Sequence, residues 1–223
     1  TDADHNIALG TNALGSDTMG SRSVAIGHGT LFTQNLTTDT NTYNVAVGYQ
    51  AGTAVTTGLQ NTIVGAAAGD ALVDADMNVA VGYLALSTDT YGSKSVAIGK
   101  EALATQNFTT ATDALNTAVG HNAGSSVTTG IQNVLVGGLA GDALTDADHN
   151  IALGTNALGS DTMGSRSVAI GHGTLFTQNF TTDTNSYNVA VGCQAGTAVT
   201  TGIQNTLIAV SYTHLTLPTI YSV

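Results

Sequence analysis

Short apolar segments that end in glycine recur along the chain at nearly fixed intervals. In "NVAVG", which ends at Gly48 and again at Gly82, the two valines lie on one face of an extended backbone and the alanine on the other. Alternation over so few residues, with glycine and polar residues between the segments, predicts short β-strands rather than helices. The segments end at Gly10, Gly27, Gly48, Gly65, Gly82, Gly99, Gly120, Gly137, Gly154, Gly171, Gly192 and Ala209.

The intervals between these segments are 17, 21, 17 and 17 residues, and this set repeats as a superunit of 72 residues. Residues 1–65 and 145–209 differ at only seven positions, as expected after a recent duplication. Units this short cannot bury an apolar face alone, so they stack on one another as a solenoid. We therefore predict parallel strands about 4.8 Å apart in a rod roughly 55–60 Å long.

The fold class predicted for residues 1–209 is all-β, a parallel β-solenoid of about twelve coils with 17 or 21 residues each. Its framework is expected to be the glycines that end the strands and the asparagines that open them. Asparagine closes turns, and asparagines stacked in register can bond the coils above and below. The framework residues are Gly27, Gly48, Gly65, Gly82, Gly99, Gly120, Gly137, Gly154, Gly171, Gly192, Asn44, Asn61 and Asn78.

Large side chains are distributed one to a coil. Coils with Leu four residues after the strand-ending glycine, such as Leu14 and Leu103, have a polar residue three positions later. Coils with glycine at that position, such as Gly52 and Gly124, have an aliphatic residue instead. Because close packing penalises both voids and overfilling, this balance predicts one thin core shared by all coils.

Composition disfavours several classes of partner. Four Lys and Arg against 15 Asp and Glu give a formal net charge of −11, whereas nucleic-acid binding needs clustered cations. The same charge disfavours anionic membranes, and no apolar run is long enough to cross a bilayer, so we expect no membrane insertion in this segment. The single cysteine, Cys193, excludes an intrachain disulfide.

The extra four residues of each 21-residue coil fall in "TQNLTTDTNTYN", "TQNFTTATDALN" and "TQNFTTDTNSYN". These segments are expected along one edge of the rod, and loops carry recognition more often than packed faces do. The alternative is that they are inert bulges. The candidate binding residues are Asn35, Thr38, Asp39, Asn107, Thr110, Asn179, Thr182 and Asp183.

The sequence predicts no catalytic, cofactor-binding or metal-binding residue, and we expect the chain not to be an enzyme. Asp70, Asp74 and Asp76 carry the oxygen ligands that Ca²⁺ prefers, but such clusters recur only once per superunit. We interpret them as solvated turn residues. The histidines other than His214 lie within the repeat, whereas a catalytic group is expected to be singular and to lie in a concavity.

The segments "SVAIGHGTLF", "SVAIGKEALA" and "NVAVGYQAGTAV" resemble the head repeats of trimeric autotransporter adhesins of the YadA type. The resemblance is strongest at residues 23–27, 95–99 and 167–171, although the coils here are longer than in that family. It implies a left-handed β-roll in which three chains lie side by side outside a bacterium and hold host surfaces or matrix. It also implies that the strand-centre alanines face the neighbouring chains. These are Ala25, Ala46, Ala80, Ala97, Ala118, Ala169 and Ala190.

The expected function is that of a structural and adhesive rod on the outer cell surface, a homotrimer whose repeated loops give multivalent attachment to a host-surface or matrix receptor. The alternative is the shaft of a phage tail fibre or surface fibre, because similar arrays occur in such fibre proteins. That shaft acts as a spacer without a receptor site. A third hypothesis, a hexapeptide-type acyltransferase, is weak because the hexapeptide occurs once per coil rather than three times.

Residues 210–223 depart abruptly from the repeat and contain the only proline, Pro218. A natural capping segment usually degrades a repeat gradually, so we interpret this segment as a non-native tail. The chain also begins in the middle of the pattern, which is expected of a fragment.

Overall fold

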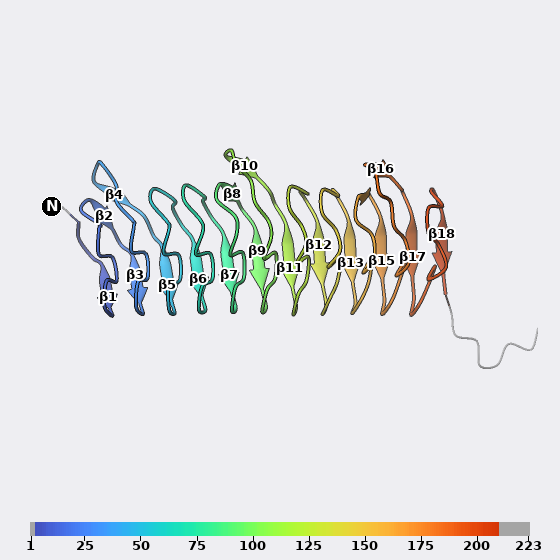
Figure 1. Cartoon of the computed structure of the whole chain (residues 1–223), viewed down its shortest axis with the longest axis horizontal. Coiled ribbons are helices and arrows are strands. Elements are labelled where there is room, and N and C mark those ends of the chain that lie inside the picture. The colour runs from blue at the N-terminus through green and yellow to red at the C-terminus, as the bar shows by residue number, and fades with distance from the viewer. Residues whose placement is uncertain (1–2, 210–223) are drawn as a thin grey trace, which may run out of the picture.

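The computed structural model describes residues 3–209 and confirms the all-β parallel solenoid of about twelve coils (Figure 1). Each strand of the main sheet pairs in parallel with its equivalent in the next coil. The twelve strands are β1 (Ile7–Leu9), β3 (Val24–Ile26), β5 (Val45–Val47), β6 (Thr62–Val64), β7 (Val79–Val81), β9 (Val96–Ile98), β11 (Thr117–Val119), β12 (Val134–Val136), β13 (Ile151–Leu153), β15 (Val168–Ile170), β17 (Val189–Val191) and β18 (Thr206–Ile208).

The pairing keeps equivalent residues in line along the rod, for example Ala25 opposite Ala46. Between residues 3 and 209 there is no helix, and hence none that could cross a membrane. The tail predicted at residues 210–223 lies outside the described residues.

The strand-centre alanines point into the rod, so the orientation that the family resemblance implied for them is wrong. Ala25, Ala97 and Ala190 are fully buried within the single chain, and the other four alanines are buried equally. The branched residues on either side of each alanine point outward instead. The interior has room only for a small strand centre in most coils, because one large side chain from the opposite wall already fills it.

The origin of that large side chain changes after every second coil along the rod. Leu103 is fully buried in its coil, whereas the next coil has Gly124 at the same register and fully buried Val127 three positions later. A Cβ atom built on Gly124 would lie 2.6 Å from Cδ1 of Leu135 and 3.1 Å from Cδ2 of Leu103. The space at the glycine is therefore filled by leucines of the two neighbouring coils, and Leu135 is one of the few large strand centres.

Each coil turns its corners through residues in the left-handed region, with φ near +50° to +65°. These corners lie two and four residues after the strand-ending glycine and one residue before the asparagine or serine that opens the next strand. Among the described residues, none of the corner positions is Val, Ile or Thr, although these types are abundant elsewhere. Branching at Cβ makes this conformation costly, so corner geometry restricts the sequence.

The asparagines that open the strands connect neighbouring coils in runs, which a serine at the same position ends once per superunit. Asn61 accepts a hydrogen bond at Oδ1 from the backbone N–H of Asn78 (3.0 Å), and its Nδ2 donates to the carbonyl oxygen of Ala75 (2.7 Å). Asn133 repeats both bonds one superunit later, to Asn150 N (2.9 Å) and Ala147 O (2.7 Å). Each buried amide thus joins its own turn to the backbone of the next coil.

Candidate functional site

The three predicted binding loops lie along one edge of the rod, above the main sheet (Figure 1). Their extra residues form small parallel sheets with the preceding coil: β2 (Gly20–Ser21) with β4 (Thr40–Asn41), β8 (Gly92–Ser93) with β10 (Thr112–Asp113), and β14 (Gly164–Ser165) with β16 (Thr184–Asn185). The loops are therefore regular extensions of the solenoid.

The candidate loop residues differ in their exposure. The exposed side chains at the tips are Thr38, Asp39, Thr110, Thr182 and Asp183. The three asparagines are held closer to the rod, since Asn35 and Asn179 accept hydrogen bonds from Thr18 (2.8 Å) and Thr162 (3.0 Å). Asn107 is half-buried and accepts a hydrogen bond from Thr90 (3.1 Å). The loop tips and the side chains of Asn35 and Asn179 are exposed, and the asparagines also bond to the neighbouring coil.

A cationic side chain in the preceding coil holds each loop, a contact that the sequence pattern did not predict. Arg22 Nε donates to Asn41 Oδ1 (2.8 Å), and Arg166 Nε donates to Asn185 Oδ1 (2.8 Å). In the middle superunit both partners differ together, and Lys94 Nζ pairs with Asp113 Oδ2 (2.5 Å). Three of the four basic residues of the chain therefore serve as loop anchors.

A buried polar cluster lies beneath each loop. In the middle superunit fully buried Asp89 accepts hydrogen bonds from Gln106 Nε2 (2.6 Å) and from the backbone N–H groups of Gly92 and Phe108 (both 3.0 Å). Gln106 Nε2 also donates to Ser95 Oγ (3.1 Å), and Gln106 Oε1 accepts from Asn116 Nδ2 (2.8 Å). Equivalent clusters centre on Gln34 and Gln178. The repeat pattern marks these residues only as polar, and the stacking of coils is what buries them.

The outward face of the main sheet is apolar along the whole rod. Two side chains of each strand lie on it, the first and the third, and among the twelve strands none of these is charged. All are Val, Ile or Leu except for three threonines, Thr62, Thr117 and Thr206. Val136, Ile151 and Ile170 are each more than a third exposed. Contiguous exposed apolar surface of this kind is typical of an interaction face.

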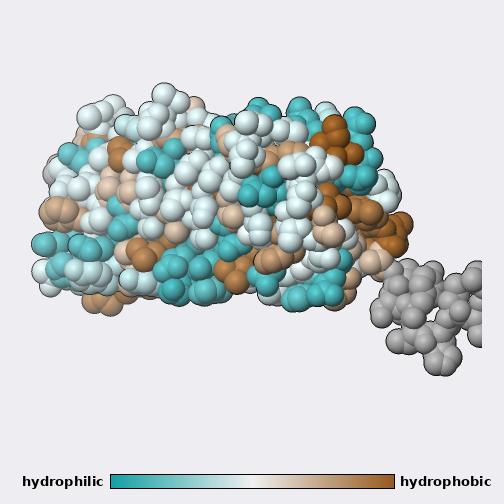
Figure 2. Space-filling view, turned by 45° about the vertical axis from the view of Figure 1, so that its right-hand side comes forward, coloured by the Kyte–Doolittle hydropathy of each residue, from teal (hydrophilic) through white to brown (hydrophobic). Residues whose placement is uncertain are grey.

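Two columns of mixed side chains flank this apolar face. One column contains exposed Tyr43, Leu115 and Tyr187, and the other contains exposed Tyr49 and Tyr83. An apolar centre with aromatic and polar residues at its rim is the usual anatomy of a protein–protein interface. The side of the rod drawn in Figure 2 is mostly pale or teal, with brown apolar groups along its lower part and at the C-terminal end.

The acidic turn residues have separate roles, and not all of them are solvated. Asp74 accepts a hydrogen bond from Thr57 Oγ1 (2.5 Å), and Asp76 accepts one from the backbone N–H of Leu59 (2.8 Å). Asp70 is half-buried, and its Oδ1 has no hydrogen-bond partner among the described residues. Burial raises the pKa of Asp70, and burial likewise raises the pKa of its equivalent Asp142.

Asp70→Asn is expected to stabilise the protein at pH 7. A raised pKa means that the folded state binds the proton more tightly than the unfolded state does, so ionised Asp70 lowers the stability above its folded-state pKa. This cost disappears once the pH falls below the ordinary value of 3.8, where both states are protonated. Thermal unfolding midpoints measured at pH 7 and pH 3 check the sign of this effect. The midpoint of the variant should exceed that of the wild type at pH 7 but not at pH 3. Asp74→Asn, on an exposed and hydrogen-bonded carboxylate, is the control and should show no such gain.

Within residues 3–209 no three His, Cys, Asp or Glu side chains lie close enough together to hold a metal ion. His28 stacks on Tyr49, with ring centroids 5.4 Å apart and planes inclined by 13°. At the equivalent register of the last superunit, exposed Cys193 stands in place of Tyr49.

Comparisons with protein-family models, with curated proteins and with solved structures found no match to this chain.

Proposed function

We propose that this chain is a structural and adhesive rod of an extracellular surface, assembled as a homotrimer. The observation that carries the proposal is the uncharged apolar face that follows the main sheet through all twelve strands. Such a face needs a partner of the same length and repeat, and a second copy of this chain meets both requirements. A chain with net charge −11 can approach itself along this face, since no charge lies on its centre.

Assembly through the sheet face leaves the loop edge free for attachment. Three chains with three loops each present many weak contacts, and linked weak contacts raise the apparent affinity without a strong single site. The resemblance to the heads of trimeric autotransporter adhesins supports the same assignment, with a receptor on host surfaces or matrix.

The shaft of a phage tail fibre or surface fibre is the second candidate, and one observation favours it. The loop asparagines, such as Asn35, and the loop residues Asn41 and Asp113 already bond to the rod itself. A loop tied down in this way can serve spacing and rigidity without contacting a receptor. The two candidates share the assembly and differ in what the loop tips bind.

The test is the solution mass of the full chain, measured by light scattering after chromatography. We expect three times the 22.3 kDa mass of one chain. The double variant Ile98→Asp/Val136→Asp places charges at two exposed sites of the sheet face and should give the mass of one chain. Thr110→Asp at a loop tip is the matched control and should keep the trimer. A folded wild-type chain with the mass of a monomer contradicts the assembly.

Attachment is measured separately, with beads coated with the full chain and cultured epithelial cells. Replacement of the loop-tip residues Thr38, Asp39, Thr182 and Asp183 by alanine should release the beads if the rod is an adhesin. If the wild-type protein forms the trimer but its beads do not bind to the cells, the result favours the fibre shaft that acts as a spacer.

A further inference from the structure

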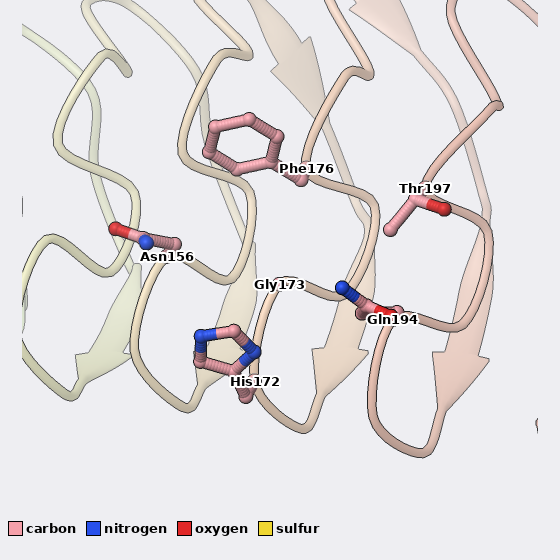
Figure 3. A pocket seen from close by; sticks show the side chains of 6 residues that line it. All are labelled: Asn156, His172, Gly173, Phe176, Gln194 and Thr197. Atoms are coloured by element: carbon pink, nitrogen blue, oxygen red, sulfur yellow. The ribbon is translucent and has the colours of Figure 1, made fainter. Parts of the chain in front are cut away.

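The face of the rod next to the main sheet carries a hollow of about 190 Å³ in the last superunit. It is lined by Asn156, His172, Gly173, Phe176, Gln194 and Thr197, which come from three successive coils. Figure 3 shows the rings of Phe176 and His172 on two sides of this space, with Asn156 at one end and Gln194 and Thr197 at the other. All six residues lie in the turns between strands, so the alternation of side chains along the strands does not place them.

The ring of Phe176 packs against Gly159 of the preceding coil. A Cβ atom built on Gly159 would lie 3.1 Å from Cε2 of Phe176, so the ring covers a glycine and could not lie so close to a larger residue. Phe176 is nevertheless 40% exposed, which leaves part of the ring open to a ligand. An exposed aromatic ring fixed on a rigid backbone offers an apolar platform at little entropic cost.

The polar groups around the platform are suited to hydroxyl groups. Asn156 and Gln194 each carry an amide that both donates and accepts hydrogen bonds, as a hydroxyl group does. None of the six lining residues is Asp, Glu, Lys or Arg, so an ionised ligand finds no fixed counter-charge. A ligand with one apolar face and several hydroxyl groups fits this combination, and a pyranose ring has that chemistry.

The same set of residues recurs in the first superunit and is replaced in the second. Asn12, His28, Phe32 and Gln50 stand eight coils before their equivalents, roughly 38 Å away along the rod. In the middle superunit Lys100, Glu101 and Ala104 stand in place of His, Gly and Phe, and Lys100 forms an ion pair with Glu101 (2.9 Å). The chain thus contains two copies of the arrangement and one internal control.

The first copy differs from the last at one neighbouring residue. Tyr49 stacks on His28, whereas exposed Cys193 stands at that register beside His172. No tyrosine therefore stands at that register in the last superunit, where His172 lines the hollow (Figure 3).

From these observations we infer that the hollow between Phe176 and His172, with its equivalent at Phe32 and His28, is a subsite for a neutral sugar ring. The ring stacks its apolar face on the phenylalanine, and its hydroxyl groups bond to the amides of Asn156 and Gln194. This inference gives a ligand class to the proposed adhesive function and rests on it for its biological meaning. Two subsites on each chain of a trimer provide multivalent binding to a polysaccharide.

The test is a set of NMR titrations of the full chain with methyl β-glucoside, methyl β-galactoside and methyl α-mannoside, and with p-cresol as an aromatic comparator. At least one glycoside is expected to receive saturation from the protein, with a Kd that the double variant Phe32→Ala/Phe176→Ala raises about tenfold. Tyr83→Ala removes an even more exposed aromatic ring outside the hollow and should leave the Kd unchanged.

Three outcomes overturn the subsite: no glycoside binds, the double variant binds as well as wild type, or only p-cresol binds. A gain-of-function variant provides an independent check. Leu84→Asn/Ser87→Gly/Lys100→His/Glu101→Gly/Ala104→Phe/Asn122→Gln copies the arrangement into the middle superunit, with the glycine that the phenylalanine ring covers, and is expected to raise the number of sites from two to three. The solution mass distinguishes a failure of the subsite from a failure of the proposed assembly. A trimer that binds no sugar contradicts the subsite and leaves the proposed assembly standing.

Discussion

Gly137→Ala is expected to lower the free energy of unfolding by about 3 kcal/mol, although it adds a single methyl group. Gly137 ends strand β12 with φ +134°, a conformation that L-residues rarely adopt. An added Cβ atom would also lie 2.6 Å from the carbonyl carbon of Gly154 in the next coil. The clash is with backbone rather than with a flexible side chain, so the two coils must separate to relieve it.

The next residue in the chain, Gly138, is the matched control. Its φ is not in the left-handed region, and a Cβ atom there would contact only the carbonyl oxygen of His121, at 3.9 Å. Gly138→Ala should therefore change stability by less than about 0.5 kcal/mol. Urea unfolding followed by circular dichroism compares the two variants directly. Equal effects at the two glycines would show that the glycine column does not set the spacing of the coils.

Asp89→Ala is expected to destabilise the protein by about 4 kcal/mol, because it leaves three buried donors without an acceptor. These donors are the side-chain amide of Gln106 and the backbone N–H groups of Gly92 and Phe108. Gln106 cannot turn its amide to compensate, since its Oε1 already accepts a hydrogen bond from Asn116 (2.8 Å). The loop of residues 105–116 loses its support together with the cluster.

Asp89→Asn keeps the volume of the side chain but replaces one of its two acceptor oxygens by a donor. It therefore separates the effect of lost hydrogen bonds from the effect of lost volume. The Nδ2 group of the new asparagine would face Nε2 of Gln106, so two donors would meet. We therefore expect about half of the loss in stability, near 2 kcal/mol. Asp39→Ala, on an exposed loop carboxylate, should cost less than about 0.5 kcal/mol. Thermal and urea unfolding of the three variants give the ranking, and an Asp89→Ala chain as stable as Asp39→Ala would refute a supporting role for the buried cluster.

Periodicity predicted the fold well because every coil makes the same contacts as its neighbours. The glycine spacing alone specifies parallel pairing, as in Ala118 opposite Leu135, and the alternation specifies which side chains share a face. The direction of those faces was not predicted correctly. Small alanines fill the interior and bulky valines cover the outside, the reverse of the usual order, since buried Leu103 or Val127 already occupies the narrow core.

The candidate site was predicted only in part, for a similar reason. The loops could be found because they interrupt the spacing, and the structure shows their tips exposed at Thr38 and Asp183. Buried Asp89 and Gln106 and the loop anchor Lys94 could not be found, because each contact joins residues 17 to 19 positions apart in different coils. The hollow at Phe176 needs three coils at once, so no single repeat unit contains its signature.

The four coils of a superunit are not interchangeable, because each is shaped to fit its neighbour. Leu135 fills the space at Gly124 and Gly141, and Asp89 in one coil accepts a hydrogen bond from Gln106 in the next. Loss of a single coil can leave the space at a glycine without the leucine that fills it, or a buried carboxylate without its amide. Recombination within such a gene can therefore yield working products only in whole blocks, and the rod evolves in length by fixed steps of roughly 19 Å.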